Sequence, residues 1–313
     1  MKVTPLSRAT LAALCIAAPV LVQAHGFAGK RFFPATLATE DPFVADELSL
    51  PTIFHQNFPA SGDEPGGHET DFAVDMSKRI TENLGIGLGA TYKIVHPDAG
   101  DTQRGFDNLE ASVKYKFYQD DAHEAIASAG IDWDIGGSGA RRVGAESFST
   151  ITPGVFFGKG FGDLPSGMKF LRPLAITGQV GYGIPTRSST TSVGDEGDIE
   201  VERNPHTLEW GFSIQYSLPY LQSFVQDVGL KAPFNRMIPV VEFAMSTALD
   251  RGQSGTTGTV NPGIIWAGQD IQWAVEAVIP VNRRSGNSVG VLAQLHFFLD
   301  DLFPQTIGRP LIR

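Results

Sequence analysis

Cysteine is almost absent from this chain of 313 residues, because Cys15 is the only one. It lies in the apolar N-terminal stretch, and Leu14 directly before it is not the small residue that a lipoprotein signal needs. The remainder of the chain therefore has neither disulfides nor thiolate metal ligands.

Charged residues are scarce as well, at 19% of the chain, and no run of about 18 apolar residues follows the N-terminus. A helical membrane anchor is thereby excluded for the rest of the sequence. Glycine, proline and phenylalanine are plentiful instead, with 35, 20 and 21 residues. This composition favours many strands and turns over long helices.

The first 24 residues have the features of a secretory signal. Lys2 and Arg8 give a positive start, Ala9 to Val22 is apolar, and Val22 and Ala24 occupy the two cleavage subsites. We predict a signal peptide over 1–24, cleavage between Ala24 and His25, and export from a bacterial cytoplasm.

The mature chain is acidic. Without the signal it has 22 Lys and Arg against 34 Asp and Glu, a net charge of −12. An exported protein of this charge is a poor partner for nucleic acid, so no nucleic-acid partner is expected.

Long segments of alternating apolar and polar residues dominate the mature sequence. In LEWGFSIQYSL (208–218), apolar Leu208, Trp210, Phe212 and Ile214 alternate with polar or small residues. Strands of soluble sandwiches usually run about 5–6 residues. About 9–11 residues match a tilted strand that crosses a bilayer, with one face toward lipid and the other toward a wet lumen.

About twelve segments of this kind occur. They are 49–57, 69–80, 84–95, 107–118, 122–135, 149–161, 171–184, 206–218, 237–248, 258–267, 270–281 and 287–299. We predict an all-β fold, a single antiparallel transmembrane β-barrel of about 12 strands in the bacterial outer membrane. The alternative is 10 strands, since Pro51 weakens the first segment. Outer-membrane lipid and, during biogenesis, the barrel-assembly machinery are the expected partners.

The predicted organisation has four parts. These are the signal peptide 1–24, an N-terminal extension 25–48, the barrel 49–299 and a C-terminal tail 300–313. Long polar connections between alternate strand pairs (96–105, 136–147, 185–205 and 250–258) are expected to be extracellular loops. Apolar residues at helical spacing in 219–237 predict a short amphipathic helix at the periplasmic rim.

Polar side chains on the predicted inner face are the candidate lumen-facing residues. They are Asp75, Glu110, Lys114, Asp132, Glu209, Glu242, Glu276 and His296. One interpretation is a salt-bridged network that fills the barrel, with Lys114, Lys116 and Arg172 as candidate cations. The other is a lumenal field that selects or binds a permeating solute.

The extension raises a related question. Either Lys30, Arg31, Phe32 and Phe33 plug the lumen, where the two cations would meet the inward carboxylates, or they lie in the periplasm.

Two alternatives to transport remain open. A mature N-terminal His25 would offer an α-amine and an imidazole to copper, with His55 or His68 as a third ligand. A barrel hydrolase would need a Ser–His pair, for which His96 with Ser149, or His123 with Ser128, are candidates. No G-x-S-x-G motif is present, and we expect neither enzymatic activity nor a cofactor.

The C-terminal third carries a family resemblance. VNPGIIWAGQDIQWAVEAVIPVNRRSGNSVGVLAQLHFFLDDLFP (260–304), together with ITENLGIGLGATYKI (80–94), resembles outer-membrane proteins grouped under the meta-pathway of phenol degradation. The extension from His25 to Leu48 and the tail after Phe298 depart from that pattern. The resemblance implies passive transport of small solutes, including aromatic or hydrophobic ones.

Overall fold

The structure is a computed structural model that describes residues 26–60, 65–193, 199–252 and 255–312. The predicted signal peptide, its cleavage site and His25 lie outside the described residues. Within those residues, no helix has both the length and the apolar character that a membrane span requires.

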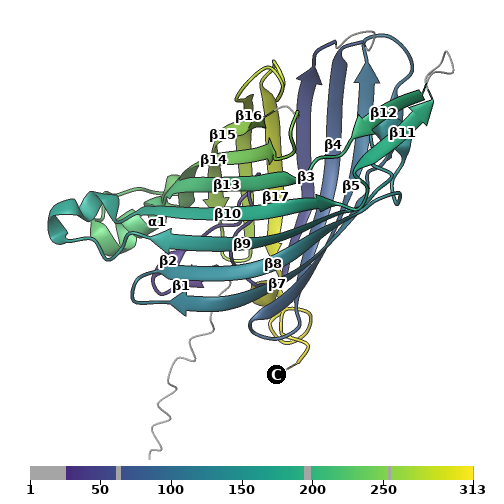
Figure 1. The fold of residues 1–313 in the computed structure, drawn as a ribbon. Helices are drawn as coiled ribbons and strands as arrows, with labels where there is room; N and C mark the ends of the chain where they lie inside the picture. The colour runs from purple at the N-terminus through teal and green to yellow at the C-terminus, as the bar shows by residue number, and fades with distance from the viewer. Residues whose placement is uncertain (1–25, 61–64, 194–198, 253–254, 313) are drawn as a thin grey trace, which may run out of the picture.

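The described residues form a closed antiparallel barrel of twelve long strands (Figure 1). The strands are β3 (Glu47–Phe58), β4 (Gly67–Arg79), β5 (Leu84–Pro97), β7 (Leu109–Asp120), β8 (Ala125–Ile135), β9 (Thr150–Gly160), β10 (Leu174–Pro185), β13 (Thr207–Tyr216), β14 (Met237–Ala248), β15 (Thr256–Ala267), β16 (Ile271–Pro280) and β17 (Gly290–Phe298). Each strand pairs with the next along the chain, and β17 pairs with β3 to close the barrel. The predicted twelve-stranded barrel is confirmed, and the ten-stranded alternative is excluded.

The alternation predicted from the sequence sets the two faces of the wall. On β13, Ser213 and Gln215 are buried inside, whereas Ile214 between them is 40% exposed on the outside. Cross-strand partners share a face, so Phe212 stacks on Phe243 of β14 with ring centroids 4.4 Å apart. Aromatic residues occur on the outer face near both barrel ends: Tyr92, Trp133 and Tyr182 near one, and Tyr115, Trp266 and Trp273 near the other. Belts of this kind mark the two membrane interfaces.

The first strand is irregular where the sequence suggested weakness. The register of β3 shifts between Ser49 and Thr52 against β4, and opposite Gln294 and His296 against β17. Leu50 and Pro51 lie in this bulge. Proline has no N–H to donate, so a bulge lets the strand continue past it without breaking the barrel.

The two ends of the barrel differ. At one end most of the connections are long, and they include β6 (Gln103–Phe106), the hairpin of β11 (Ser189–Val193) and β12 (Ile199–Arg203), and the turn η1 (Arg141–Val143). This is the predicted extracellular end. The other, the predicted periplasmic end, carries three short turns, the longer connections 161–173 and 217–236, the start of the described chain and the tail, in which α2 (Leu299–Leu302) follows β17. None of these short strands was predicted, since loops of this composition show no sustained alternation.

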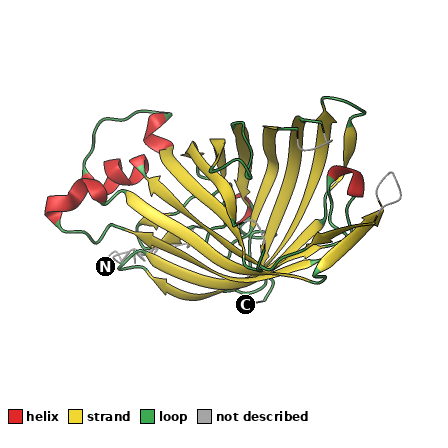
Figure 2. Cartoon of the chain, turned by 45° about the horizontal axis from the view of Figure 1, so that its top comes forward, coloured by secondary structure: helices red, strands yellow, loops and turns green. Residues whose placement is uncertain are grey.

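The helix predicted in 219–237 is shorter than expected. The chain forms α1 (Leu218–Tyr220), a π-helical turn η3 (Leu221–Val225) and, later, η4 (Phe234–Arg236). Together with η2 (Ser166–Leu171), these turns gather at the predicted periplasmic end (Figure 2). The helix ends because the backbone becomes extended at Gln226.

Candidate functional site

Residues 26–46, here called the N-terminal segment, lie inside the barrel. Side chains of the neighbouring strands β7 and β8, and of β16 on another side of the wall, donate hydrogen bonds to its backbone. Lys114 Nζ of β7 bonds Asp41 O at 2.9 Å, Gln272 Nε2 of β16 bonds Ala35 O at 2.7 Å, and Ser128 Oγ of β8 bonds Pro42 O. Contacts to different sides of a closed wall require the segment to occupy the lumen, which is the first of the two positions that the sequence left open.

Arg31 fixes the start of the segment at the predicted periplasmic end. It belongs to a small hairpin of β1 (Phe27–Ala28) and β2 (Arg31–Phe32), and it is fully buried. Its Nε lies 3.2 Å from Glu124 Oε2, its Nη1 donates to Pro173 O at 2.9 Å, and its guanidinium lies 3.8 Å from the ring centroid of Tyr220. The Tyr220 hydroxyl completes the cluster by donating to Glu124 Oε1 at 2.8 Å.

Burial sets the electrostatics of this cluster. It lowers the pKa of Arg31, and the Glu124 carboxylate opposes that effect. Burial also raises the pKa of Tyr220 to about 12, with the Glu124 carboxylate adding to the shift. Glu124 was not a candidate in the sequence, because it lies in the turn between β7 and β8, where no alternation indicates which way a side chain points.

The other candidate residues of the segment divide into packed and exposed ones. Phe33 packs with Ala28 and Ala175 in one buried cluster. Phe32 packs on a second cluster of the inner wall, made of Ile238, Val240, Ile265, Ala267 and Ala274. Lys30 is exposed and lies 5.6 Å from the ring centroid of Phe224. The expectation that Lys30 meets an inward carboxylate is therefore wrong, since its side chain lies at the rim.

Glu242 holds the middle of the segment. This fully buried carboxylate accepts hydrogen bonds from the backbone N–H groups of Leu37, Ala38 and Thr39 at 2.7–3.0 Å, and from Thr39 Oγ1 at 2.7 Å. Glu276 on β16 is equally buried and interacts with Glu242 and Asn261, but no hydrogen bond joins it to the described residues of the segment. The two carboxylates therefore differ: one binds the segment and the other does not.

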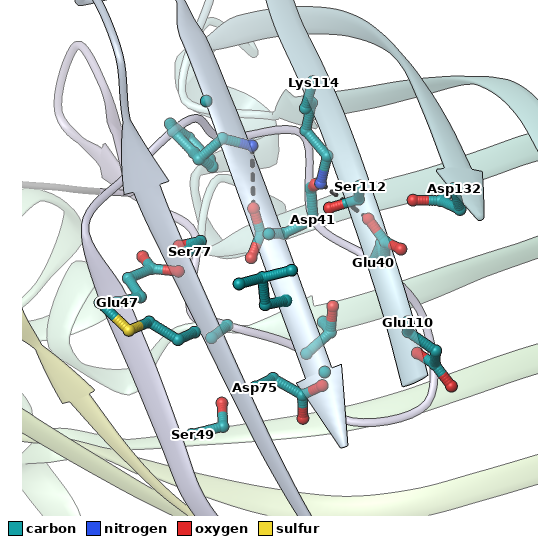
Figure 3. Close-up of a pocket in the computed structure, with 18 of the residues that line it drawn as sticks. Glu40, Asp41, Glu47, Ser49, Asp75, Ser77, Glu110, Ser112, Lys114 and Asp132 are labelled. Carbon is teal, nitrogen blue, oxygen red and sulfur yellow. Dashed lines mark hydrogen bonds and ion pairs between the residues drawn. The ribbon is translucent and has the colours of Figure 1, made fainter. Parts of the chain in front are cut away.

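A cavity of about 560 Å³ lies between the segment and the wall. Carboxylates from both sides line it: Glu40, Asp41 and Glu47 from the segment and the start of β3, and Asp75, Glu110 and Asp132 from the wall (Figure 3). Asp134 of the wall also belongs to this lining. Lys114 is the single lysine or arginine of this lining, and its Nζ lies 2.8 Å from Glu40 Oε2. The acidic side chains of this lining thus outnumber its one lysine.

Glycines on the inner face of β5 give this cavity its room. A Cβ on Gly89 would lie 2.8 Å from Asp75 Oδ1, and one on Gly87 would collide with Ser112 Oγ. Any larger residue at these positions would push the polar side chains of the neighbouring strands out of place.

All eight candidate lumen-facing residues lie on the inner face of the wall. Asp75, Glu110, Lys114, Asp132 and His296 line the cavity. Glu242 and Glu276 are buried beside the segment, and Glu209 accepts a hydrogen bond from Ser246 Oγ at 2.7 Å. Of the candidate cations for a filling network, Lys114 alone pairs with a carboxylate of the cavity. The residues that sequence reasoning missed, Glu40 and Asp134 among them, come from an irregular segment and a strand end.

The hydrolase pairs suggested by the sequence are not formed. His123 Nδ1 pairs with Asp120, and His96 Nδ1 bonds Thr102 Oγ1 at 2.6 Å. A different pair lies in the cavity wall at the β3 bulge. Ser49 Oγ is 2.9 Å from His296 Nδ1, and His296 Nε2 is 3.7 Å from Glu47 Oε2.

The structure does not bring the two suggested third ligands for copper, His55 and His68, to the start of the described chain. His55 and His68 lie near the predicted extracellular ends of β3 and β4, whereas residue 26 lies at the opposite end. The described residues also contain no group of three or more His, Cys, Asp or Glu arranged to hold a metal. Copper binding at His25 stays a prediction.

Comparison with known proteins shows likeness at the level of structure. No protein-family model and no curated protein matches the sequence. An outer membrane channel from Pseudomonas putida F1 matches with a TM-score of 0.56 and 10% identity, over 85% of this chain and 99% of that chain. The KdgM porin matches with a TM-score of 0.44 and 12% identity, and the NanC porin with 0.45 and 10%, each over 80% of this chain and 98% of the other.

At such low identity the likeness concerns the fold alone. It confirms the predicted outer-membrane β-barrel, and it agrees with the predicted location in the bacterial outer membrane. The more specific resemblance to the phenol-degradation family has no support from a family match. The chain is an outer-membrane β-barrel with a channel-like fold, and its lumen holds its own N-terminal segment.

Proposed function

We propose that this chain is a passive outer-membrane channel for small polar solutes and that it favours positively charged ones. The observation that carries the proposal is the acidic lining of the cavity, where the carboxyl groups of Glu40, Asp75, Glu110 and Asp132 are accompanied by a single ammonium group, Lys114. Charges of one sign within low-dielectric walls raise the local concentration of the opposite ion and exclude ions of the same sign.

The lining supports polar solutes over purely hydrophobic ones. Besides the carboxylates, it contains hydroxyl and amide groups: Ser49, Ser77, Ser112, Thr150, Thr152, Gln179 and Gln294. Side chains of this kind form hydrogen bonds with a partly dehydrated solute. An aromatic solute would need a polar or cationic group to use these partners.

The N-terminal segment acts as the constriction in this proposal. It occupies the half of the lumen nearest the predicted periplasmic end, where Arg31 and Glu242 fix it to the wall. A solute must pass between the segment and the strands that line the cavity. We therefore expect slow passage of small solutes and not the broad permeability of an empty barrel of this size.

Liposome swelling tests the charge preference directly. Proteoliposomes are diluted into isosmotic lysine, glutamate or a neutral sugar, and the swelling rate reports entry. We expect lysine to enter fastest, and the triple variant Asp75→Asn/Glu110→Gln/Asp132→Asn to lose that advantage. Glu202→Gln on the exposed β12 is the matched control and keeps the preference. Faster entry of glutamate, or equal entry of all three solutes, contradicts the proposal.

The Ser49–His296 pair supports a second candidate, an esterase within the lumen. In that reaction Ser49 Oγ attacks the ester carbonyl while His296 takes its proton and passes it to the departing alcohol. Water then hydrolyses the acyl-serine, and the Glu47 carboxylate, 3.7 Å from His296 Nε2, favours the protonated imidazole. A fluorophosphonate probe tests it. Labelling of the wild type and of Ser77→Ala, but not of Ser49→Ala, would support the candidate. An unlabelled wild-type barrel removes it.

A further inference from the structure

A row of nitrogen-bearing side chains crosses adjacent strands near the predicted extracellular end of the barrel. His55 of β3, His68 of β4 and His96 of β5 follow one another, with ring centroids 5.6 Å and 4.9 Å apart. Arg104 of β6 extends the row, because it pairs with Ile94, two residues before His96. The row could not be predicted from the sequence, since its first and last histidines are 41 positions apart.

The row lies on the outer face of the barrel. Asp71 of β4 and Lys93 of β5 point inward, and Lys93 pairs there with Asp107. His68 lies three residues before Asp71, and His96 lies three residues after Lys93. Because successive side chains of a strand point to opposite faces, both histidines face outward. Arg104 shares the face of its partner Ile94.

A hollow beside the row adds a second guanidinium. It has a volume of about 470 Å³ and is lined by Tyr92, Arg104, Phe106 and Arg142, among others. Arg142 Nε donates to the backbone oxygen of Arg104, which brings both arginines to the same rim of the hollow. Neither guanidinium forms an ion pair with a carboxylate of the described residues, so both keep donors for a ligand.

We propose that this surface binds the phosphate groups of a glycolipid in the outer leaflet of the membrane. The outer wall toward the membrane centre is apolar, with Leu88 65% exposed, as contact with acyl chains requires. Tyr92 and Phe106, whose ring centroids are 5.2 Å apart, lie at the level of an interfacial belt. The arginines and histidines lie at the rim, where headgroup phosphates occur.

The chemistry of the row suits phosphate in particular. Guanidinium groups match phosphate oxygens with paired N–H donors. His55 Nδ1 lies 2.8 Å from Thr70 Oγ1 and His96 Nδ1 lies 2.6 Å from Thr102 Oγ1. When Nδ1 accepts from the hydroxyl, the ring hydrogen is on Nε2, which becomes a donor for an anion. In a chain whose mature charge is −12, such a row is a local exception and not a property of the whole surface.

Lipid titration of the folded, detergent-solubilised barrel tests the proposal. Native mass spectrometry measures retention of lipid A, which carries two phosphates, of the same lipid after dephosphorylation, and of inorganic phosphate. The test variant is Arg104→Gln/Arg142→Gln. The matched control is Arg187→Gln/Arg203→Gln, which removes two exposed arginines at the same end of the barrel. Heat-modifiable gel migration shows that each variant is folded.

We expect the wild type and the control to retain lipid A roughly tenfold or more better than the test variant. Dephosphorylated lipid should bind all three proteins equally weakly. Equal retention of lipid A by the test variant and the wild type overturns the proposal, as does wild-type retention of the dephosphorylated lipid that equals its retention of lipid A. Displacement of lipid A by inorganic phosphate at the same concentration would show a free-anion site and also overturn it.

Discussion

At the residue scale, the lumen is organised by two buried ionic groups that bind backbone atoms. Arg31 bonds carbonyl oxygens of the strand connections, and Glu242 bonds N–H groups of the segment. A buried charge is strongly unfavourable unless its hydrogen-bonding capacity is used. Because both groups connect the segment to the wall, detaching the segment would leave each without its partners.

Replacing Glu242 should weaken the hold on the segment. Glu242→Gln keeps the size but removes one acceptor oxygen, so at least one buried N–H loses its partner. We expect a loss of about 1–3 kcal/mol in the free energy of detaching the segment. The rate at which a protease cleaves residues 26–46 in the folded barrel, measured at increasing urea concentrations, reports that free energy.

Glu276→Gln is the matched control for this change. It alters a neighbouring carboxylate of equal burial that forms no hydrogen bond with the described residues of the segment. The segment should be as resistant as in the wild type. Equal protease sensitivity of the segment in the two variants would show that Glu242 has no special role in holding it.

Replacing Arg31 should weaken the attachment of the segment more than replacing Glu242 does, since Glu124 would then be buried without its cation. We expect Arg31→Met to destabilise the attachment of the segment by about 3–5 kcal/mol. The double variant Arg31→Met/Glu124→Gln should recover part of this loss, because no unpaired charge remains. The same protease assay measures both. Additive losses would mean that the 3.2 Å contact between the two groups contributes nothing.

At the element scale, the barrel strands were predictable and the segment was not. Alternation over ten residues defines both a strand and its two faces, so the eight inner-face candidates followed from parity alone. The partners Glu40, Asp41 and Glu124 lie in irregular backbone, where no period indicates direction. The histidine row depends on the register between three strands, which the sequence does not specify.

The segment is separable from the wall in this fold. The ladder closes through β17 and β3, and no strand of the segment joins it. Deleting residues 26–46 should therefore leave a folded barrel with a clearly larger single-channel conductance. Planar bilayers measure the conductance, and heat-modifiable migration checks the fold. An unchanged conductance would place the constriction elsewhere, in the long loops.

At the scale of the whole molecule, acidic, apolar and nitrogen-bearing side chains occupy different surfaces. Carboxylates line the cavity, apolar residues cover the membrane-facing wall, and the nitrogen-bearing row is confined to one rim. Such sorting separates the path of a solute from contact with lipid. A lumenal field of this kind is screened by salt over about 10 Å at 0.1 M and about 3 Å at 1 M. Any charge preference should therefore be strong in dilute salt and weak in concentrated salt.

The reversal potential of the wild-type barrel in a planar bilayer is the most direct test of the lumen as a cation-favouring path. With a tenfold gradient of potassium chloride, dilute on both sides, the account predicts a potential near that of a potassium-selective pore, and a smaller one when both solutions are concentrated. A potential of the opposite sign, or one that ignores salt concentration, would contradict the account.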